Sequence, residues 1–164
     1  MQHITQGNTL TLERTFNAPR QKVWNAFTLK DEFVKWWGPR GWVTEVKEFN
    51  FTEGGVNHYG MKCVDETQIE LYEKYSWGKM VFSNIRPIDS YEYEDVFSDE
   101  YGTTKTELPG SKTKIQFLEE GEKTKIISKT EFADEQALQT VIDMGMISGV
   151  TETWDRLEEL VSGK

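Results

Sequence analysis

Cysteine and histidine are scarce in this chain of 164 residues, and their scarcity limits the chemistry that the chain can carry. Cys63 is the only cysteine, so no intramolecular disulfide can form, and a reducing, cytoplasmic compartment is expected. Two distant histidines and one cysteine cannot supply the ligand set of a zinc site. We therefore expect no metal and no cofactor.

Long apolar runs and an excess of positive charge are also missing. No stretch approaches the ~20 consecutive apolar residues that a membrane-spanning helix needs. The 19 Lys and Arg residues stand against 28 Asp and Glu residues, a net charge of −9, whereas nucleic-acid binding needs clustered cations. The sequence therefore predicts neither a membrane nor a nucleic-acid partner.

Aromatic residues, in contrast, are abundant. They make up 13% of the chain, as six Trp, six Tyr and nine Phe. Such side chains bury large areas, and they also line a cavity where packing leaves one.

The period of the hydrophobic pattern changes along the chain. Alternation predicts a first strand over about 8–16, and a helical period then predicts two short helices that end at Gly38. A period of two returns after this pair and predicts about six further strands. Residues 134–161 carry a helical stripe with Asp134 as N-cap, which predicts one long helix.

These elements predict a single α+β domain over residues 1–164, with residues 1–7 loosely ordered. Strands with one apolar and one charged face are typical of an antiparallel sheet that has one side in water. The economical arrangement is a curved antiparallel sheet of about seven strands around the long C-terminal helix, with the two short helices closing one end.

Four stretches of the chain resemble motifs of a known superfamily. They are Phe16-Asn17-Ala18-Pro19 leading to Val23-Trp24, Trp36-Trp37-Gly38-Pro39 followed by Gly41-Trp42, Phe51 through Gly54-Gly55 to Tyr59, and Met144-Gly145-Met146 with Gly149 and Asp155-Arg156-Leu157. As a set they resemble the START-like (SRPBCC) superfamily of the birch-pollen allergen, in the branch named after the activator of the heat-shock-protein-90 ATPase. The resemblance covers residues 10–161 and implies the helix-grip fold, which commonly encloses a cavity.

The last helix departs from the pattern of these relatives at two positions. Relatives commonly carry a large aromatic residue where this chain has Val150, and they usually carry Leu where it has Trp154. The exchange either conserves the volume of the core or relocates a wall of the cavity.

No catalytic constellation is recognisable, because Ser, His and Asp residues do not occur at the spacing of a nucleophile elbow or a similar motif. His58 is expected at the surface or an edge, since alternation points it away from Tyr59. A cluster of carboxylates, whose spacing is not that of a calcium loop, is expected to form a solvated acidic face. Its members are Glu92, Glu94, Asp95, Asp99 and Glu100. Whether the chain is an enzyme stays open, and a non-enzymatic binding protein is favoured.

The residues expected to face inward form the candidate ligand-binding site. They are Trp37, Phe51, Asn57, Tyr59, Met61, Tyr91, Tyr93, Phe97, Phe117, Met144, Met146 and Gly149. Mostly apolar walls with a few convergent polar groups are typical of a small-molecule cavity, although a filled core would use the same residue types. Together with the resemblance, this set predicts binding of a small hydrophobic or aromatic molecule between the sheet and the C-terminal helix.

Two other functions remain open at this point. The resemblance implies an interaction module, a co-chaperone-like partner of the heat-shock-protein-90 ATPase. It also implies a cyclase- or hydrolase-type enzyme that uses the same cavity.

Overall fold

The structure is a computed structural model that describes residues 1–107 and 110–163. Its elements follow one another as β1 (Gln2–Gln6), β2 (Thr9–Phe16), α1 (Arg20–Thr28), α2 (Lys30–Trp36), β3 (Trp42–Phe49), β4 (Val56–Cys63), β5 (Tyr75–Arg86), β6 (Ser90–Ser98), β7 (Ser111–Glu120), β8 (Lys123–Phe132), α3 (Glu135–Asp143) and α4 (Met146–Val161). The prediction of an α+β fold, with two short helices that follow the strand over about 8–16, is confirmed.

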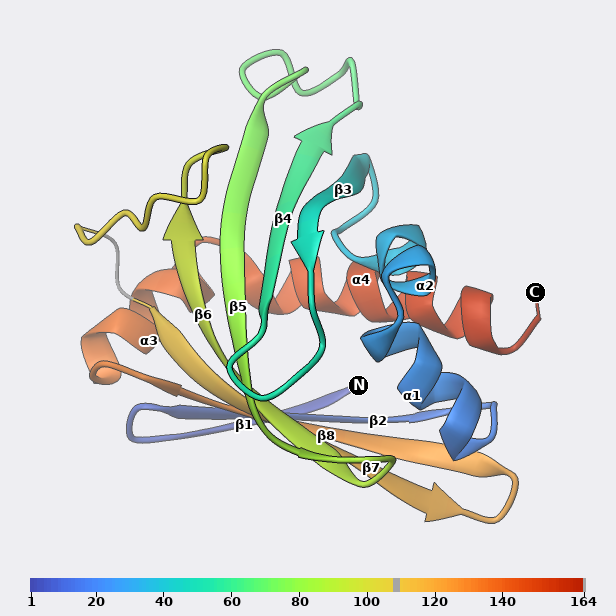
Figure 1. The fold of residues 1–164 in the computed structure, drawn as a ribbon. Coiled ribbons are helices and arrows are strands. Elements are labelled where there is room, and N and C mark those ends of the chain that lie inside the picture. The colour runs from blue at the N-terminus through green and yellow to red at the C-terminus, as the bar shows by residue number, and fades with distance from the viewer. Residues whose placement is uncertain (108–109, 164) are drawn as a thin grey trace.

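All the strands belong to one antiparallel sheet in the order β1-β2-β8-β7-β6-β5-β4-β3. The sheet bends strongly, so that β3 to β6 rise steeply from the layer that β1, β2, β7 and β8 form (Figure 1). Helix α4 runs across the inside of the bend, and α1 and α2 lie beside its C-terminal half (Figure 1). The alternating apolar residues of β2, which include Leu10 and Leu12, are buried on the face that meets the helices.

Two sequence expectations about the ends of the chain are wrong. Residues 2–6, expected to be loosely ordered, form β1, which pairs with β2 and brings the sheet to eight strands. The helix expected over 134–161 is two helices, because Gly145 has a φ of 90° and interrupts the helical backbone between α3 and α4. The predicted N-cap is confirmed, since the Asp134 carboxylate accepts a hydrogen bond from the backbone N–H of Ala137 (2.8 Å).

The aromatic residues of α1 fill one end of the space between sheet and helices. Trp24 packs edge-on against Phe51, Tyr91 and Phe117, with ring centroids 5.0–5.9 Å apart. Phe27 adds a further edge-on contact to Phe117 at 5.2 Å. These contacts make this end a close-packed aromatic core.

None of the helices in the described part of the chain combines the length and the apolar character that a membrane crossing needs.

Candidate functional site

Next to the packed aromatic residues around Trp24, the interior contains a cavity of about 290 Å³ between the bent sheet and helices α3 and α4. Apolar side chains dominate its wall, and a few hydroxyl groups and one carboxyl group interrupt them. The wall consists of Leu10, Leu12, Phe27, Trp37, Tyr59, Met61, Ser76, Trp77, Tyr91, Tyr93, Asp95, Val96, Phe97, Ser111, Thr113, Ile115, Ser128, Thr130, Phe132, Val141, Met146, Val150 and Trp154. Mostly apolar walls with a few placed polar groups are typical of small-molecule sites.

The wall brings together many of the residues that the sequence singled out. Trp37, Tyr59, Met61, Tyr91, Tyr93, Phe97 and Met146 all line the cavity. Phe97 does so while 43% of it remains exposed, which indicates a position near the opening. Both residues at which the chain departs from its relatives, Val150 and Trp154, also belong to the wall.

Phe51, Phe117 and Asn57 were expected in this wall and lie elsewhere. The two phenylalanines belong to the packed end of the interior, where Trp24 covers them. Asn57 is fully buried within the sheet, with its amide nitrogen 3.7 Å from the Met80 sulfur, and its Oδ1 meets no donor of the described protein atoms. All three side chains are on the inner side of the sheet, as expected, but they lie outside the part of it that lines the cavity.

Met144 and Gly149 are the other two corrections. Met144 is 80% exposed, because it ends α3 just before Gly145 turns the chain. A Cβ at Gly149 would meet no atom within 4 Å, and this glycine borders a separate surface groove that Arg40 and Glu152 also line. The stripe of a continuous helix would have turned both residues inward, whereas the break changes the face that α4 presents.

Asp95 is a polar residue of the cavity wall that is absent from the predicted site, although the strand pattern around it indicates its position. Asp95 was assigned to a solvated acidic face, yet it follows Tyr91 and Tyr93 in steps of two along β6 and therefore shares their inward face. The structure places it in the cavity wall, whereas Glu94 points to solvent. The alternation rule applied to each acidic residue separately would have found it.

The Asp95 carboxyl group is held by Tyr59, whose hydroxyl donates to Oδ1 at 3.0 Å and lies 3.3 Å from Oδ2. Burial raises the pKa of Asp95 to about 7, although the hydrogen bond from Tyr59 opposes the rise. Burial, and then the nearby Asp95 charge, raise the pKa of Tyr59 well above its ordinary value, so Tyr59 remains a neutral donor. The pair is thus a weakly acidic carboxyl group beside a fixed hydroxyl group, facing an apolar space.

Gly78 makes this contact possible. Tyr59 on β4 pairs with Gly78 on β5, and a Cβ at residue 78 would stand 2.6 Å from the Tyr59 hydroxyl oxygen. Without a side chain there, the phenol ring crosses β5 and reaches β6, where Asp95 lies. A glycine inside a strand commonly marks such a close approach.

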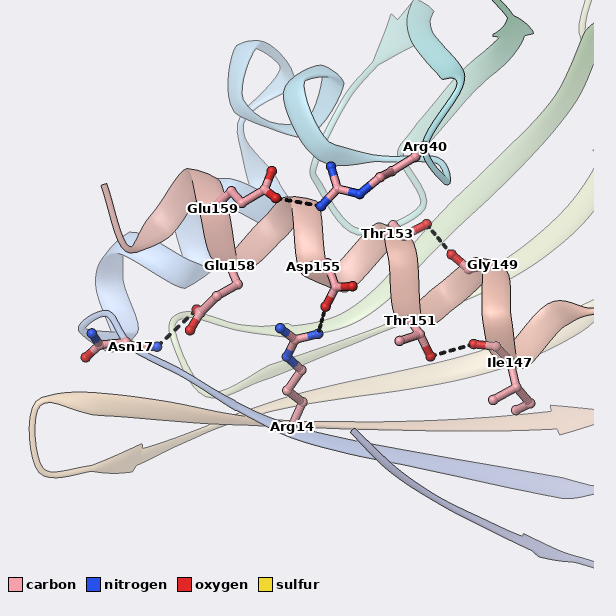
Figure 2. Close-up of polar contacts among 10 residues, drawn as sticks. All are labelled: Arg14, Asn17, Arg40, Ile147, Gly149, Thr151, Thr153, Asp155, Glu158 and Glu159. Atoms are coloured by element: carbon pink, nitrogen blue, oxygen red, sulfur yellow. Dashed lines mark hydrogen bonds and ion pairs between the residues drawn. The ribbon is translucent and has the colours of Figure 1, made fainter. Parts of the chain in front are cut away.

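Helix α4, which covers the cavity, is attached to the rest of the fold by polar contacts (Figure 2). Asp155 pairs with Arg14 of β2 at 2.7 Å, and Glu159 pairs with Arg40 at 2.5 Å. Arg156 adds hydrogen bonds from Nη1 to the carbonyl oxygens of Gly38 (2.7 Å) and Trp42 (3.2 Å). These contacts fix α4 against β2 and against the segment that carries Trp37 of the cavity wall.

The two histidines do not enter the site. His58 was expected at the surface or an edge, but it is buried on β4, which lies between β3 and β5. Its Nε2 is 3.0 Å from the carbonyl oxygen of Asp99, and its ring is 5.3 Å from that of Trp77. The turn that follows β6 folds over it. Among residues 1–107 and 110–163, no group of three or more His, Cys, Asp or Glu side chains could hold a metal ion.

A family model described as "Activator of Hsp90 ATPase homolog 1-like protein" matches residues 17–162. No curated protein sequence matches the chain. Among solved structures, a protein from Staphylococcus epidermidis is 29% identical, with a TM-score of 0.85 over 99% of this chain and 94% of that one. A protein from Mycobacterium smegmatis is 26% identical, with a TM-score of 0.82 over 96% of each chain.

A third structure, the AHSA1 protein from Silicibacter pomeroyi, shares the fold at 16% identity, with a TM-score of 0.72 over 94% of this chain and 97% of that one. The model match spans nearly the whole domain, and it agrees with the motifs that resemble the START-like superfamily. The chain therefore belongs to the family of activator of Hsp90 ATPase homolog 1-like proteins.

Proposed function

We propose that this protein binds a small hydrophobic or aromatic molecule in the cavity between the bent sheet and helices α3 and α4. The observation that carries the proposal is the cavity itself, a space of about 290 Å³ with apolar walls. Close-packed protein interiors contain few voids larger than a water molecule. A space near the lower end of the range for ligand sites, roughly 300–1,000 Å³, is therefore more than a packing defect.

The interior has a packed aromatic end and an open end, and this contrast supports the same function. The aromatic residues around Trp24 fill one end of the fold with edge-on contacts, so the chain has the means to close its interior. At the other end α4 lines the open space with Met146, Val150 and Trp154, and Val150 is the smallest of the three. A small residue of α4 thus borders the open space between two larger ones.

A neutral aromatic probe tests this proposal. Naphthylmethanol should bind and raise the melting temperature, because a ligand that binds only the folded state stabilises it by mass action. At 100 times its Kd the gain is about 2.7 kcal/mol, which corresponds to roughly 5–10 °C for a domain of this size. Amide shifts that map to Tyr93 and Val150 would locate the probe.

The variant Val150→Phe should fill the cavity, abolish probe binding and leave the folded state at least as stable. Met144→Phe is the matched control, since it adds the same ring at an exposed position and should leave binding unchanged. If a panel of neutral aromatic and aliphatic probes gives no binding and Val150→Phe unfolds the protein, the interior is a filled core and the proposal is wrong.

A cytoplasmic location is part of the proposal and rests on Cys63, which is buried and free. The co-chaperone and cyclase or hydrolase alternatives stay predictions. No contact of the described residues favours either of them over ligand binding.

A further inference from the structure

Among the described residues of the cavity wall, Asp95 is the only carboxylate, and the others carry no charge. The other titratable groups of the described wall are tyrosines, Tyr59 from β4 and Tyr91 and Tyr93 from β6. None of the described wall residues is Lys, Arg or His. No acidic side chain is contributed to the described wall by β2, β5, β7, β8, α1, α3 or α4. A ligand in this cavity therefore meets a single formal charge, and that charge is negative.

The hydrogen bonds of Asp95 are incomplete. The Tyr59 hydroxyl supplies one proton, shared unequally between Oδ1 at 3.0 Å and Oδ2 at 3.3 Å. An ionised carboxylate can accept about four hydrogen bonds. No ion pair involves Asp95 among the described residues, so most of its acceptor capacity is available to a donor in the cavity.

Aromatic rings surround this carboxyl group. Tyr93 and Phe97 flank it on the same face of β6, and the ring of Tyr59 reaches it from β4. The faces of aromatic rings attract cations, and the attraction increases when water is excluded. A carboxylate among aromatic rings is thus matched to a positive charge on an otherwise apolar molecule.

We propose that the ligand of this cavity carries a protonated amine on its apolar or aromatic body, and that Asp95 binds this amine as its counter-ion. The inference rests on the proposed function and narrows it to one chemical class. Tyr59 acts as a positioning residue, since its hydrogen bond fixes the carboxylate that receives the amine. The net charge of −9 also attracts cationic ligands to the protein.

The pH dependence of binding follows from the same pair. Because the pKa of Asp95 is about 7 without ligand, the carboxyl group is largely protonated at about pH 5 and ionised at about pH 8. A neighbouring cation favours the ionised form. Affinity for an amine should therefore rise between these pH values, whereas affinity for a neutral molecule of the same shape should not.

Three probes that share one aromatic body test the inference by calorimetry. They are naphthylmethylamine, which is protonated over this pH range, neutral naphthylmethanol and anionic naphthoate. At about pH 8 the amine should bind on the order of tenfold to a hundredfold more tightly than the alcohol, as expected for a hydrogen bond to a charged group. Naphthoate should bind more weakly than the alcohol, and the preference for the amine should shrink at about pH 5.

Two variants and one matched control identify the residue. Asp95→Asn keeps the shape of the side chain, and it should bring the amine and the alcohol within about twofold of each other. Glu94→Gln removes the same charge one residue away on the exposed face and should leave the preference unchanged. Tyr59→Phe should keep the preference for the amine but move its onset to higher pH, because the hydrogen bond from Tyr59 lowers the pKa of Asp95.

The possible failures separate the two proposals. Equal binding of the amine and the alcohol by the unmodified protein would overturn the assignment of Asp95 while the cavity proposal stands. A preference that survives Asp95→Asn but disappears in Glu94→Gln would overturn it as well, because the attraction would then come from the surface. If none of the probes binds, the proposed function itself fails.

Discussion

The ring of Tyr59 lies over Gly78 of the neighbouring strand, and the missing side chain at residue 78 lets the Tyr59 hydroxyl reach Asp95 on the strand beyond. A second cross-strand pair has the same form, since Gly60 faces the ring of Trp77 at a distance that excludes a Cβ. The two aromatic side chains come from adjoining strands, and only the ring of Tyr59 makes a hydrogen bond to Asp95.

Gly78→Ala should displace the ring of Tyr59 from Asp95. The added methyl group would stand 2.6 Å from the hydroxyl oxygen, and overpacking of this kind costs about 1–3 kcal/mol of unfolding free energy. Urea denaturation would measure the loss, and calorimetry at about pH 7 would measure a reduced preference for naphthylmethylamine, because loss of the Tyr59 hydrogen bond moves the onset of the preference to higher pH. Gly60→Ala is the control, because its methyl group would meet Trp77 and not Tyr59. It should destabilise the protein and leave the Tyr59–Asp95 hydrogen bond in place, and since Trp77 is an uncharged residue of the cavity wall, its shift should change the affinities for the amine and the alcohol alike. Equal effects of both variants on ligand preference would show that Gly78 has no special relation to the site.

The free energy of unfolding should fall as the pH rises from about 4 to about 7. The pKa of Asp95 in the folded protein, about 7, lies above that of an exposed Asp, about 3.9, so the folded state binds the proton more tightly. The stabilising contribution of the protonated group is complete below about pH 4 and is lost as the pH passes about 7. Asp95→Asn should remove this trend. Its unfolding free energy, compared with that of the unmodified protein, should therefore increase by up to about 2 kcal/mol from about pH 5 to about pH 8.

Asp99→Asn is the control for the pH series. Backbone N–H groups of Thr103 and Tyr101 donate to the Asp99 carboxylate and lower its pKa, so it stays ionised above about pH 4. Its replacement should change the stability by the same amount at about pH 5 and at about pH 8. A parallel pH trend in the unmodified protein and in Asp95→Asn would show that another group causes it.

Gly145→Ala should destabilise the protein by about 1–2 kcal/mol. Gly145 has a φ of 90°, a conformation in which a Cβ is strained, and it begins α4. Gly149→Ala, one turn further on, should stabilise the protein by up to about 1 kcal/mol, since it is helical and a Cβ there meets nothing. Chemical denaturation measures the change in unfolding free energy, which should be a loss in Gly145→Ala and a gain in Gly149→Ala. A loss of stability in Gly149→Ala would contradict the open space beside it.

Arg156→Lys should lower the unfolding free energy by about 1–2 kcal/mol. The guanidinium group donates to the carbonyl oxygens of Gly38 and Trp42 from Nη1 and of Lys35 from Nη2, and one ammonium group cannot span them. Arg40→Lys should lower the unfolding free energy much less than Arg156→Lys does, because the ion pair of Arg40 with Glu159 is exposed (Figure 2). Similar losses in both variants would show that the carbonyl contacts of Arg156 contribute little.

Local patterns in the sequence predict most of the fold. Strand β7 alternates Thr113, Ile115 and Phe117 with lysines and glutamine, and the structure buries the first set and not the second. The Asp134 cap depends on a backbone N–H three residues away and could be recognised without any long-range contact. The break at Gly145 could not be recognised from the sequence. A glycine within a helical pattern can take a helical or a left-handed backbone, and packing of α3 and α4 decides between them.

The candidate site divides in the same way. Period two determines which residues of β4 and β6 face the helices, and this includes Asp95, which the acidic cluster around it obscured. The sequence does not determine where along that face the interior is filled and where it is open. That boundary depends on Trp24 entering one end from α1, on Gly78 letting Tyr59 cross a strand, and on Gly145 turning α4. The first two contacts join segments that are separate in the chain, and the third depends on how α3 and α4 pack, so only the tertiary structure decides the boundary.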